Sequence, residues 1–131
     1  MRPDEYEPSP LLRGACLAAA VVVVFQLFYL GAQPAAAGLF QEPWDKVAHF
    51  CVFAGLTALL WKGSAGRMPV AVIAVVILVA GLDELHQAGI PGRYASIGDF
   101  VVDAGAALST GAVMLFLDAR GVMPRPQPAG R

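Results

Sequence analysis

The stretch GLDELHQAGIPGRYASIGDFVVD, residues 81–103, decides the fold of this chain. It leaves one long apolar run, crosses a Gly/Pro turn and enters a second apolar run. Polar and ionisable side chains are concentrated within it: Asp83, Glu84, His86, Gln87, Arg93, Ser96, Asp99 and Asp103. A charged group at membrane depth costs about 2.5–3.5 kcal/mol on insertion scales. The stretch therefore predicts a functional site between two apolar segments.

Composition places the chain among membrane proteins. Its 131 residues suffice for one domain, 57% of them are hydrophobic and 15% are charged, whereas a soluble domain carries about 25% charged residues. The net charge of −1 gives no indication of nucleic-acid binding. Cys16 and Cys51 lie inside apolar runs at opposite predicted depths, so we expect them to be unpaired apolar fillers.

Four apolar segments predict an all-α, polytopic membrane protein with four transmembrane helices in an antiparallel bundle. Each segment approaches the ~20 residues needed to cross the hydrocarbon core, and Gly/Pro-containing loops separate them. The predicted spans are residues 14–32, 45–61, 68–87 and 98–117. Together they form one domain, residues 14–118, between tails at residues 1–13 and 119–131.

The first apolar run has a second interpretation. Arg13, the run itself and the Ala35–Ala37 triplet together resemble a signal peptide with its cleavage site. The run is longer than a signal-peptide core and further spans follow, so we expect an uncleaved anchor. Cleavage would remove one helix and leave the orientation of the others unchanged.

Basic residues predict the orientation. Seven lie in segments expected on one side of the membrane: Arg2, Arg13, Lys62, Arg67, Arg120, Arg125 and Arg131. Two, Lys46 and Arg93, lie on the other side. The positive-inside rule therefore predicts that both termini are cytoplasmic.

The polar residues of three helices are expected at one level in the outer part of the bilayer. Spacings of three or four residues put each pair on one helix face, and we expect these faces to point inward, with Arg93 above them. The pairs are Lys46 and His49, Glu84 and Gln87, and Asp99 and Asp103. His86 is expected to be exposed.

The last predicted helix also carries small residues along one flank, namely Gly105, Ser109 and Ala112 or Val113. Such a stripe lets helices approach closely. We expect it to be a packing surface.

These residues resemble the motifs of the VanZ-like family, small bacterial membrane proteins named for a teicoplanin-resistance factor. The resemblance covers Trp44 to about Gly111. It is carried by Asp45-Lys46-x-x-His49 with Phe53, by Glu84-x-x-Gln87, and by Pro91-Gly92-Arg93, Ser96, Asp99 and Asp103-x-Gly105. The family more often has Asn where this chain has Asp103. The resemblance implies a bacterial inner membrane location and a role in envelope or glycopeptide-related physiology, but no defined reaction.

Three functional interpretations stay open. As an enzyme, a hydrolase or transferase of an envelope lipid, the protein would use Glu84 as general acid or base and His49 as proton shuttle. As a binder, it would hold a membrane lipid or a lipid-linked envelope precursor. The binding residues would then be Lys46, Gln87, Arg93, Ser96, Asp99 and Asp103. Alternatively, the protein is not catalytic and either binds a partner protein or uses the polar residues only to join the helices.

Some of the same residues could also form a metal site. His49, Glu84, Asp99 and Asp103 offer one imidazole and three carboxylates, a set that suits Zn or Mn. No His-x-x-x-His or Glu-x-x-His helix pair is present in the sequence. We therefore expect no metal and no cofactor.

Overall fold

Four long helices make up the protein in the computed structural model, which describes residues 8–36 and 38–122. They are α1 (Pro10–Gly31), α2 (Trp44–Gly63), α3 (Pro69–Ala88) and α4 (Ile97–Ala119), with a short 3-10 helix, η2 (Pro34–Ala36), after α1. The described residues contain no strand, so the predicted all-α class is confirmed. The four helices overlap the four predicted segments. Most of the two predicted tails, including Arg2, Arg125 and Arg131, lies outside the described residues.

Local sequence explains where the helices begin. The Ser9 hydroxyl accepts a hydrogen bond from the Leu12 amide, and Pro10 occupies the first turn of α1. Ser96 does the same for the amide of Asp99 at the start of α4. A hydroxyl at this position satisfies an amide that has no partner inside the helix, and proline is tolerated there because its missing N–H would be unpaired anyway.

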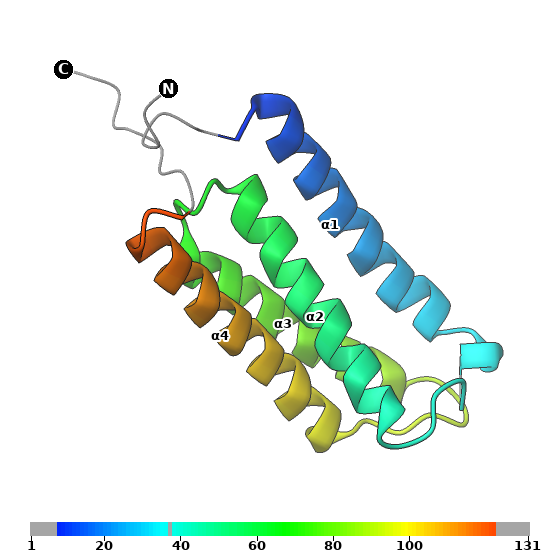
Figure 1. The fold of residues 1–131 in the computed structure, drawn as a ribbon. Helices are drawn as coiled ribbons and strands as arrows, with labels where there is room; N and C mark the ends of the chain where they lie inside the picture. The colour runs from blue at the N-terminus through cyan, green and yellow to red at the C-terminus, as the bar shows by residue number, and fades with distance from the viewer. Residues whose placement is uncertain (1–7, 37, 123–131) are drawn as a thin grey trace.

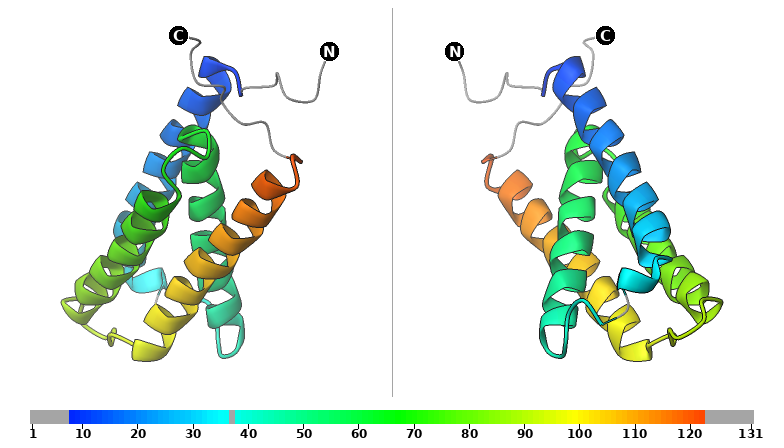
Figure 2. Two further views of the ribbon diagram at one scale, coloured as in Figure 1. Left: turned by 90° about the vertical axis from the view of Figure 1, so that its left-hand side faces the viewer. Right: turned by 90° about the vertical axis from the view of Figure 1, so that its right-hand side faces the viewer.

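The helices run up and down in antiparallel order (Figure 1). The beginning of α1, the α2–α3 connection and the end of α4 lie at one end of the bundle. The other end, here called the polar end, is formed by the last turn of α1, the first turns of α2 and α4, and the last turns of α3. Helix α2 packs most extensively against α4 and α1 and also contacts α3, so it occupies the middle of the bundle (Figure 2).

Small side chains form much of the core. The buried cluster contains Ala20, Phe53, Leu56, Val76, Ala80, Ala106 and Ala107. On α4 the buried face carries Ala106, Ala107 and Gly111. The prediction that small residues on the other flank form a packing surface was wrong. Exposed positions include all of them: Gly105, Ser109, Ala112 and Val113.

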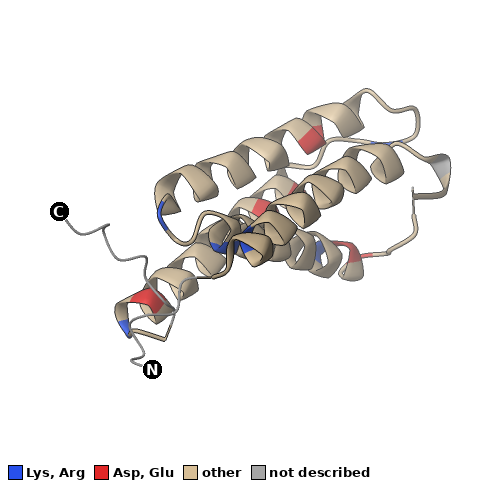
Figure 3. Cartoon of the chain, turned by 90° about the horizontal axis from the view of Figure 1, so that it is seen from above, with Lys and Arg blue, Asp and Glu red and all other residues tan. Residues whose placement is uncertain are grey.

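Three of the helices in the described part of the chain, α1, α3 and α4, are long and apolar enough to cross a membrane. Large apolar side chains such as Phe25, Leu78 and Val101 point outward from them, as expected for a surface in contact with lipid. Acidic and basic residues are sparse along the ribbon (Figure 3). The protein is therefore an all-α protein with helices of membrane-spanning character. Cys16 is buried, Cys51 is exposed, and both are free, as predicted.

Candidate functional site

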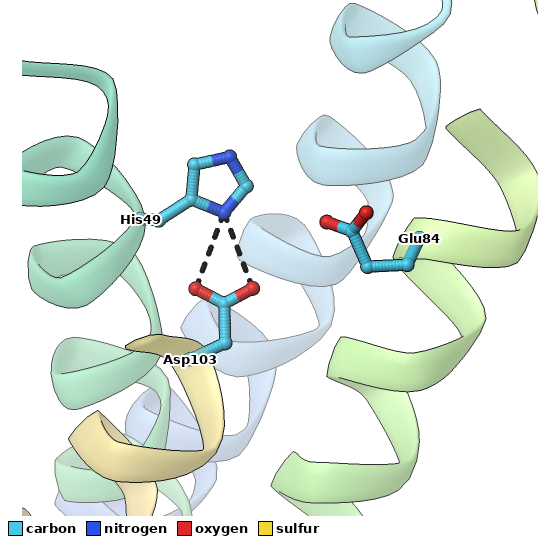
Figure 4. A group of neighbouring side chains, drawn as sticks. All are labelled: His49, Glu84 and Asp103. Atoms are coloured by element: carbon cyan, nitrogen blue, oxygen red, sulfur yellow. Dashed lines mark hydrogen bonds and ion pairs between the residues drawn. The ribbon is translucent and has the colours of Figure 1, made fainter. Parts of the chain in front are cut away.

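A histidine–aspartate pair joins α2 to α4 near the polar end. His49 Nδ1 lies 3.2 Å from both Oδ1 and Oδ2 of Asp103, and the pair is drawn in Figure 4. Asp103 is 0% exposed, while the His49 side chain is mostly buried. A carboxylate buried this completely is stable only when it is paired or hydrogen-bonded, and His49 supplies that interaction.

Glu84 approaches this pair from α3. Its Oε2 accepts a hydrogen bond of 2.6 Å from the Ser96 amide, just before α4. Its Oε1 is buried and has no hydrogen-bond partner among the described residues. The Glu84 side chain projects from α3 toward His49 and Asp103 (Figure 4), and one donor atom from each of the three residues lies within 4.8 Å of the others.

A second polar chain connects α3 to the end of α1. Gln87 Nε2 donates to Asp83 Oδ2 at 2.7 Å, and Gln87 Oε1 accepts from Arg93 Nη2 at 3.0 Å. Arg93 Nη1 in turn donates to the carbonyl of Gly31 at 2.6 Å. The last carbonyls of a helix have no partner within it, so Arg93 closes the end of α1 and fastens the α3–α4 turn to it.

Lys46 forms the rim of the polar end. Its Nζ lies 2.6 Å from Glu42, 3.5 Å from Asp99 and 3.7 Å from Asp45. It is partly exposed, so these ion pairs are screened by solvent and contribute little to stability. Lys46 therefore reaches the carboxylates of the rim, whereas His49, one turn along the same helix, reaches the buried Asp103.

All eight predicted site residues lie at the polar end, in three groups. His49, Glu84 and Asp103 meet in the interior. Gln87 and Arg93 join α3 to α1. Lys46 and Asp99 meet at the rim. Ser96 connects the groups, because its amide binds Glu84 while its hydroxyl caps α4. Arg93 was expected above the polar faces of the helices, and its hydrogen bonds go to the Gly31 carbonyl and the Gln87 side chain.

Two residues at the polar end differ from the expectation: Asp83, which was not among the predicted site residues, and His86. Asp83 is 1% exposed and belongs to the Gln87–Arg93 chain, which its spacing of four residues from Gln87 could have indicated. His86 was expected to be exposed, and this prediction was wrong. It is partly buried, with its ring 5.2 Å from that of Phe28 on α1.

A cavity of about 720 Å³ runs inward from the polar end. Its polar lining includes His49, Asp83, Gln87, Arg93 and Asp99, and its apolar lining includes Val23 and Leu27 of α1 and Val52, Leu56 and Leu59 of α2. Leu59 is ten residues along α2 from His49, so the lining extends about 15 Å along this helix at 1.5 Å per residue. Most of the polar lining thus lies toward the polar end, where Leu39 and Phe40 also line the cavity, and the lining deeper along α2 is apolar.

Residues 14–117 match the VanZ/LLP1 family. No curated protein and no solved structure matches the chain.

Proposed function

Because the chain belongs to the VanZ/LLP1 family, we propose that it is a bacterial inner-membrane protein that binds an envelope lipid or a lipid-linked cell-wall precursor at its polar end. The observation that carries this proposal is the cavity, whose polar end adjoins apolar walls from α1 and α2. A lipid has the same division between headgroup and chain. Binding sites for small molecules are commonly apolar with a few polar groups that orient the ligand.

Arg93 is the proposed headgroup contact. It lines the cavity, and its terminal nitrogens make one bond each to Gly31 and Gln87. A guanidinium has five N–H donors, so donors are left for an anionic oxygen. Its planar fork also matches phosphate and carboxylate geometry. Lys46 adds a positive charge at the rim.

We propose four spans, with α2 as the fourth. Its 20 residues extend about 30 Å, the thickness of the hydrocarbon core. It carries Asp45 and Lys46 near one end and Lys62 near the other, which makes it less apolar than its neighbours. Its place in the middle of the bundle supports a spanning role, because polar groups are tolerated where protein rather than lipid surrounds them.

Charge supports cytoplasmic termini. The described basic residues at the end opposite the polar end are Arg13, Lys62, Arg67 and Arg120, against Lys46 and Arg93 at the polar end. The positive-inside rule then puts the polar end outside the cytoplasm. The proposed site would face the compartment in which the cell wall is assembled.

Lipid retention tests the binding proposal. The protein would be purified in mild detergent as wild type, Arg93→Lys and Arg93→Gln, and the co-purified lipids identified by mass spectrometry. Hydrogen bonds to a charged group contribute about 1.5–3 kcal/mol, so Arg93→Gln should lower retention of anionic lipid roughly 10- to 150-fold. Arg93→Lys keeps the positive charge and should retain more anionic lipid than Arg93→Gln. Bound lipid with the headgroup composition of the bulk membrane in all three proteins would contradict the proposal.

A membrane-embedded hydrolase or transferase is the second candidate. The observation that favours it is the His49–Asp103 pair facing the unpartnered oxygen of Glu84 (Figure 4). In this scheme Glu84 is the general acid or base, and Asp103 orients His49. A nucleophile is harder to name, because the Ser96 hydroxyl already caps α4.

Glycopeptide susceptibility separates a working site from a purely structural network. A susceptible bacterium would produce wild type or Glu84→Gln at matched membrane levels and be challenged with a teicoplanin-type drug. Protection by wild type and not by Glu84→Gln would support a function at the polar end. Equal protection by both would favour a network that only joins the helices.

A further inference from the structure

Three potential metal ligands converge from three different helices. His49 on α2, Glu84 on α3 and Asp103 on α4 each place a donor atom within 4.8 Å of the others. Glu84 is 7% exposed and Asp103 is 0% exposed. No single helix carries two of these ligands, which explains why the sequence shows none of the local metal-binding spacings.

Two of the three ligands already have a suitable separation. Zinc bonds to imidazole nitrogen and carboxylate oxygen measure about 2.0–2.2 Å, so two ligands of one tetrahedral ion lie roughly 3.3 Å apart. His49 Nδ1 is 3.2 Å from each Asp103 oxygen. An ion could therefore replace the proton between them without moving α2 relative to α4.

Glu84 supplies an independent indication. Its Oε1 is buried and lacks a hydrogen-bond partner in the described part of the chain, and the side chain points at the His49–Asp103 pair (Figure 4). A buried carboxylate oxygen left unpaired is costly. The Ser96 amide holds the other oxygen at 2.6 Å, as outer-shell donors commonly do for ligating carboxylates. The Glu84 oxygen that lies within 4.8 Å of the other two donor atoms would have to move by roughly 1.5 Å to reach the ligand spacing above.

The balance of charge at the polar end also favours a bound cation. The two basic side chains at the polar end have other partners, since Lys46 meets the rim carboxylates and Arg93 binds Gly31 and Gln87. Glu84 and Asp103 are thus two buried carboxylates that share one imidazole. Buried charges are normally paired or coordinate metals.

We propose that His49 Nδ1, Glu84 and Asp103 bind one divalent transition-metal ion, Zn²⁺ or Mn²⁺. Imidazole suits zinc, and carboxylates suit manganese as well. Three protein ligands leave a coordination position for water or for an oxygen of a ligand, and His49 lines the cavity. This site does not depend on lipid binding, and its test requires no lipid.

Metal content of the purified full-length chain tests the site. Wild type, Glu84→Gln, Asp103→Asn and Asp118→Asn would be purified with a histidine-free tag, stripped with chelator, and reloaded with Zn²⁺ or Mn²⁺. Bound metal would be counted by inductively coupled plasma mass spectrometry, and bound Mn²⁺ observed by electron paramagnetic resonance. Asp118→Asn is the matched control, since it makes the same change on α4 at the opposite end of the bundle, where the amide oxygen can still accept the hydrogen bond from Trp61.

The expected result is about one ion per wild-type chain, as a single site with three protein ligands requires. Asp118→Asn should bind the ion like wild type. Glu84→Gln and Asp103→Asn should each lose at least about tenfold in affinity, because even outer-shell losses cost this much. The melting temperature of wild type should rise with added metal, since binding to the folded state stabilises it.

Two results would overturn the proposal. Folded wild type that takes up neither ion would show that a shared proton, and not a metal, joins the three side chains. Equal metal content in wild type, Glu84→Gln and Asp103→Asn would show that the ion binds elsewhere. Neither result depends on Arg93, so failure of the metal site and failure of lipid binding can be told apart.

Discussion

Gly55 provides a direct way to fill the cavity without disturbing the core. It lies within α2, is exposed and lines the cavity. A Cβ built on it would meet nothing within 4 Å in the described residues. Gly55→Leu should therefore place its side chain in the space proposed for the lipid, with no clash in the unliganded protein.

Gly55→Leu is expected to keep or raise the stability of the protein and to lower its retention of lipid. Leucine is better than glycine inside a helix by up to about 1 kcal/mol, so the variant should be at least as stable as wild type. A bound chain would then overlap the new side chain, and overpacking costs about 1–3 kcal/mol. Lipid retention should fall roughly 5- to 150-fold. A loss of ligand without a loss of stability identifies occlusion.

Gly105 provides the matched control. It is also an exposed glycine within a helix with nothing within 4 Å of a built Cβ among the described residues, and it does not line the cavity. Lipid per protein would be measured by mass spectrometry, and stability by thermal unfolding in detergent, for wild type, Gly55→Leu and Gly105→Leu. Equal retention in Gly55→Leu and wild type, or equal loss in both variants, would refute occlusion of this cavity.

Three further predictions follow from individual contacts. Ser96→Ala removes the cap of α4 and should lower the free energy of unfolding by about 0.5–2 kcal/mol. Thermal or denaturant unfolding in detergent would measure this loss. Ser96→Thr keeps a hydroxyl at the cap and should retain most of the stability. The indole N–H of the buried Trp61 donates to Asp118 Oδ2 at 3.3 Å. Asp118→Ala removes this acceptor and should lower the free energy of unfolding by about 1–3 kcal/mol. An unchanged melting temperature would contradict this. In a cysteine-free background, Tyr94→Cys at the polar end should react with a membrane-impermeant thiol reagent from outside the cell, and Val122→Cys only after the cells are opened. The reverse pattern would invert the proposed topology.

Positions of the helices were predictable because apolar runs and the loops between them differ sharply in composition. The Gly/Pro turn between α3 and α4 could be identified from residue types alone. The level of the polar residues could be estimated from counting along each helix, because the rise per residue is constant. Length and composition therefore carried the prediction of the bundle.

Rotation of each helix about its axis was harder to predict. In a soluble helix, polar residues mark the exposed face, but a helix in lipid is apolar on both its packed and its lipid-facing sides. Small residues therefore predict a packing face at Gly105 and Ser109, whereas α4 packs through Ala106 and Gly111. Small residues were present on both sides, and nothing local separated them.

Contacts made by the turn between α3 and α4 also could not be predicted from the sequence. The bond from Arg93 to Gly31 joins residues that are 62 positions apart, and it depends on where the last turn of α1 lies. The burial of Asp83 depends in the same way on how α3 is rotated. Such contacts follow from tertiary packing, which residue spacing within one helix does not specify.

Helix α2 shows how a membrane protein can carry a polar site at modest cost. It is the least apolar of the four long helices in the described residues and the one with the most extensive packing. The two properties are connected, since a polar side chain inside a bundle is surrounded by protein groups that can pair with it. His49 meets Asp103 on α4, and the apolar side chains of α2 form a wall of the cavity. On the more lipid-exposed α1, the same histidine would face hydrocarbon without a partner, so a site that combines imidazole and carboxylates is best supported on the central helix.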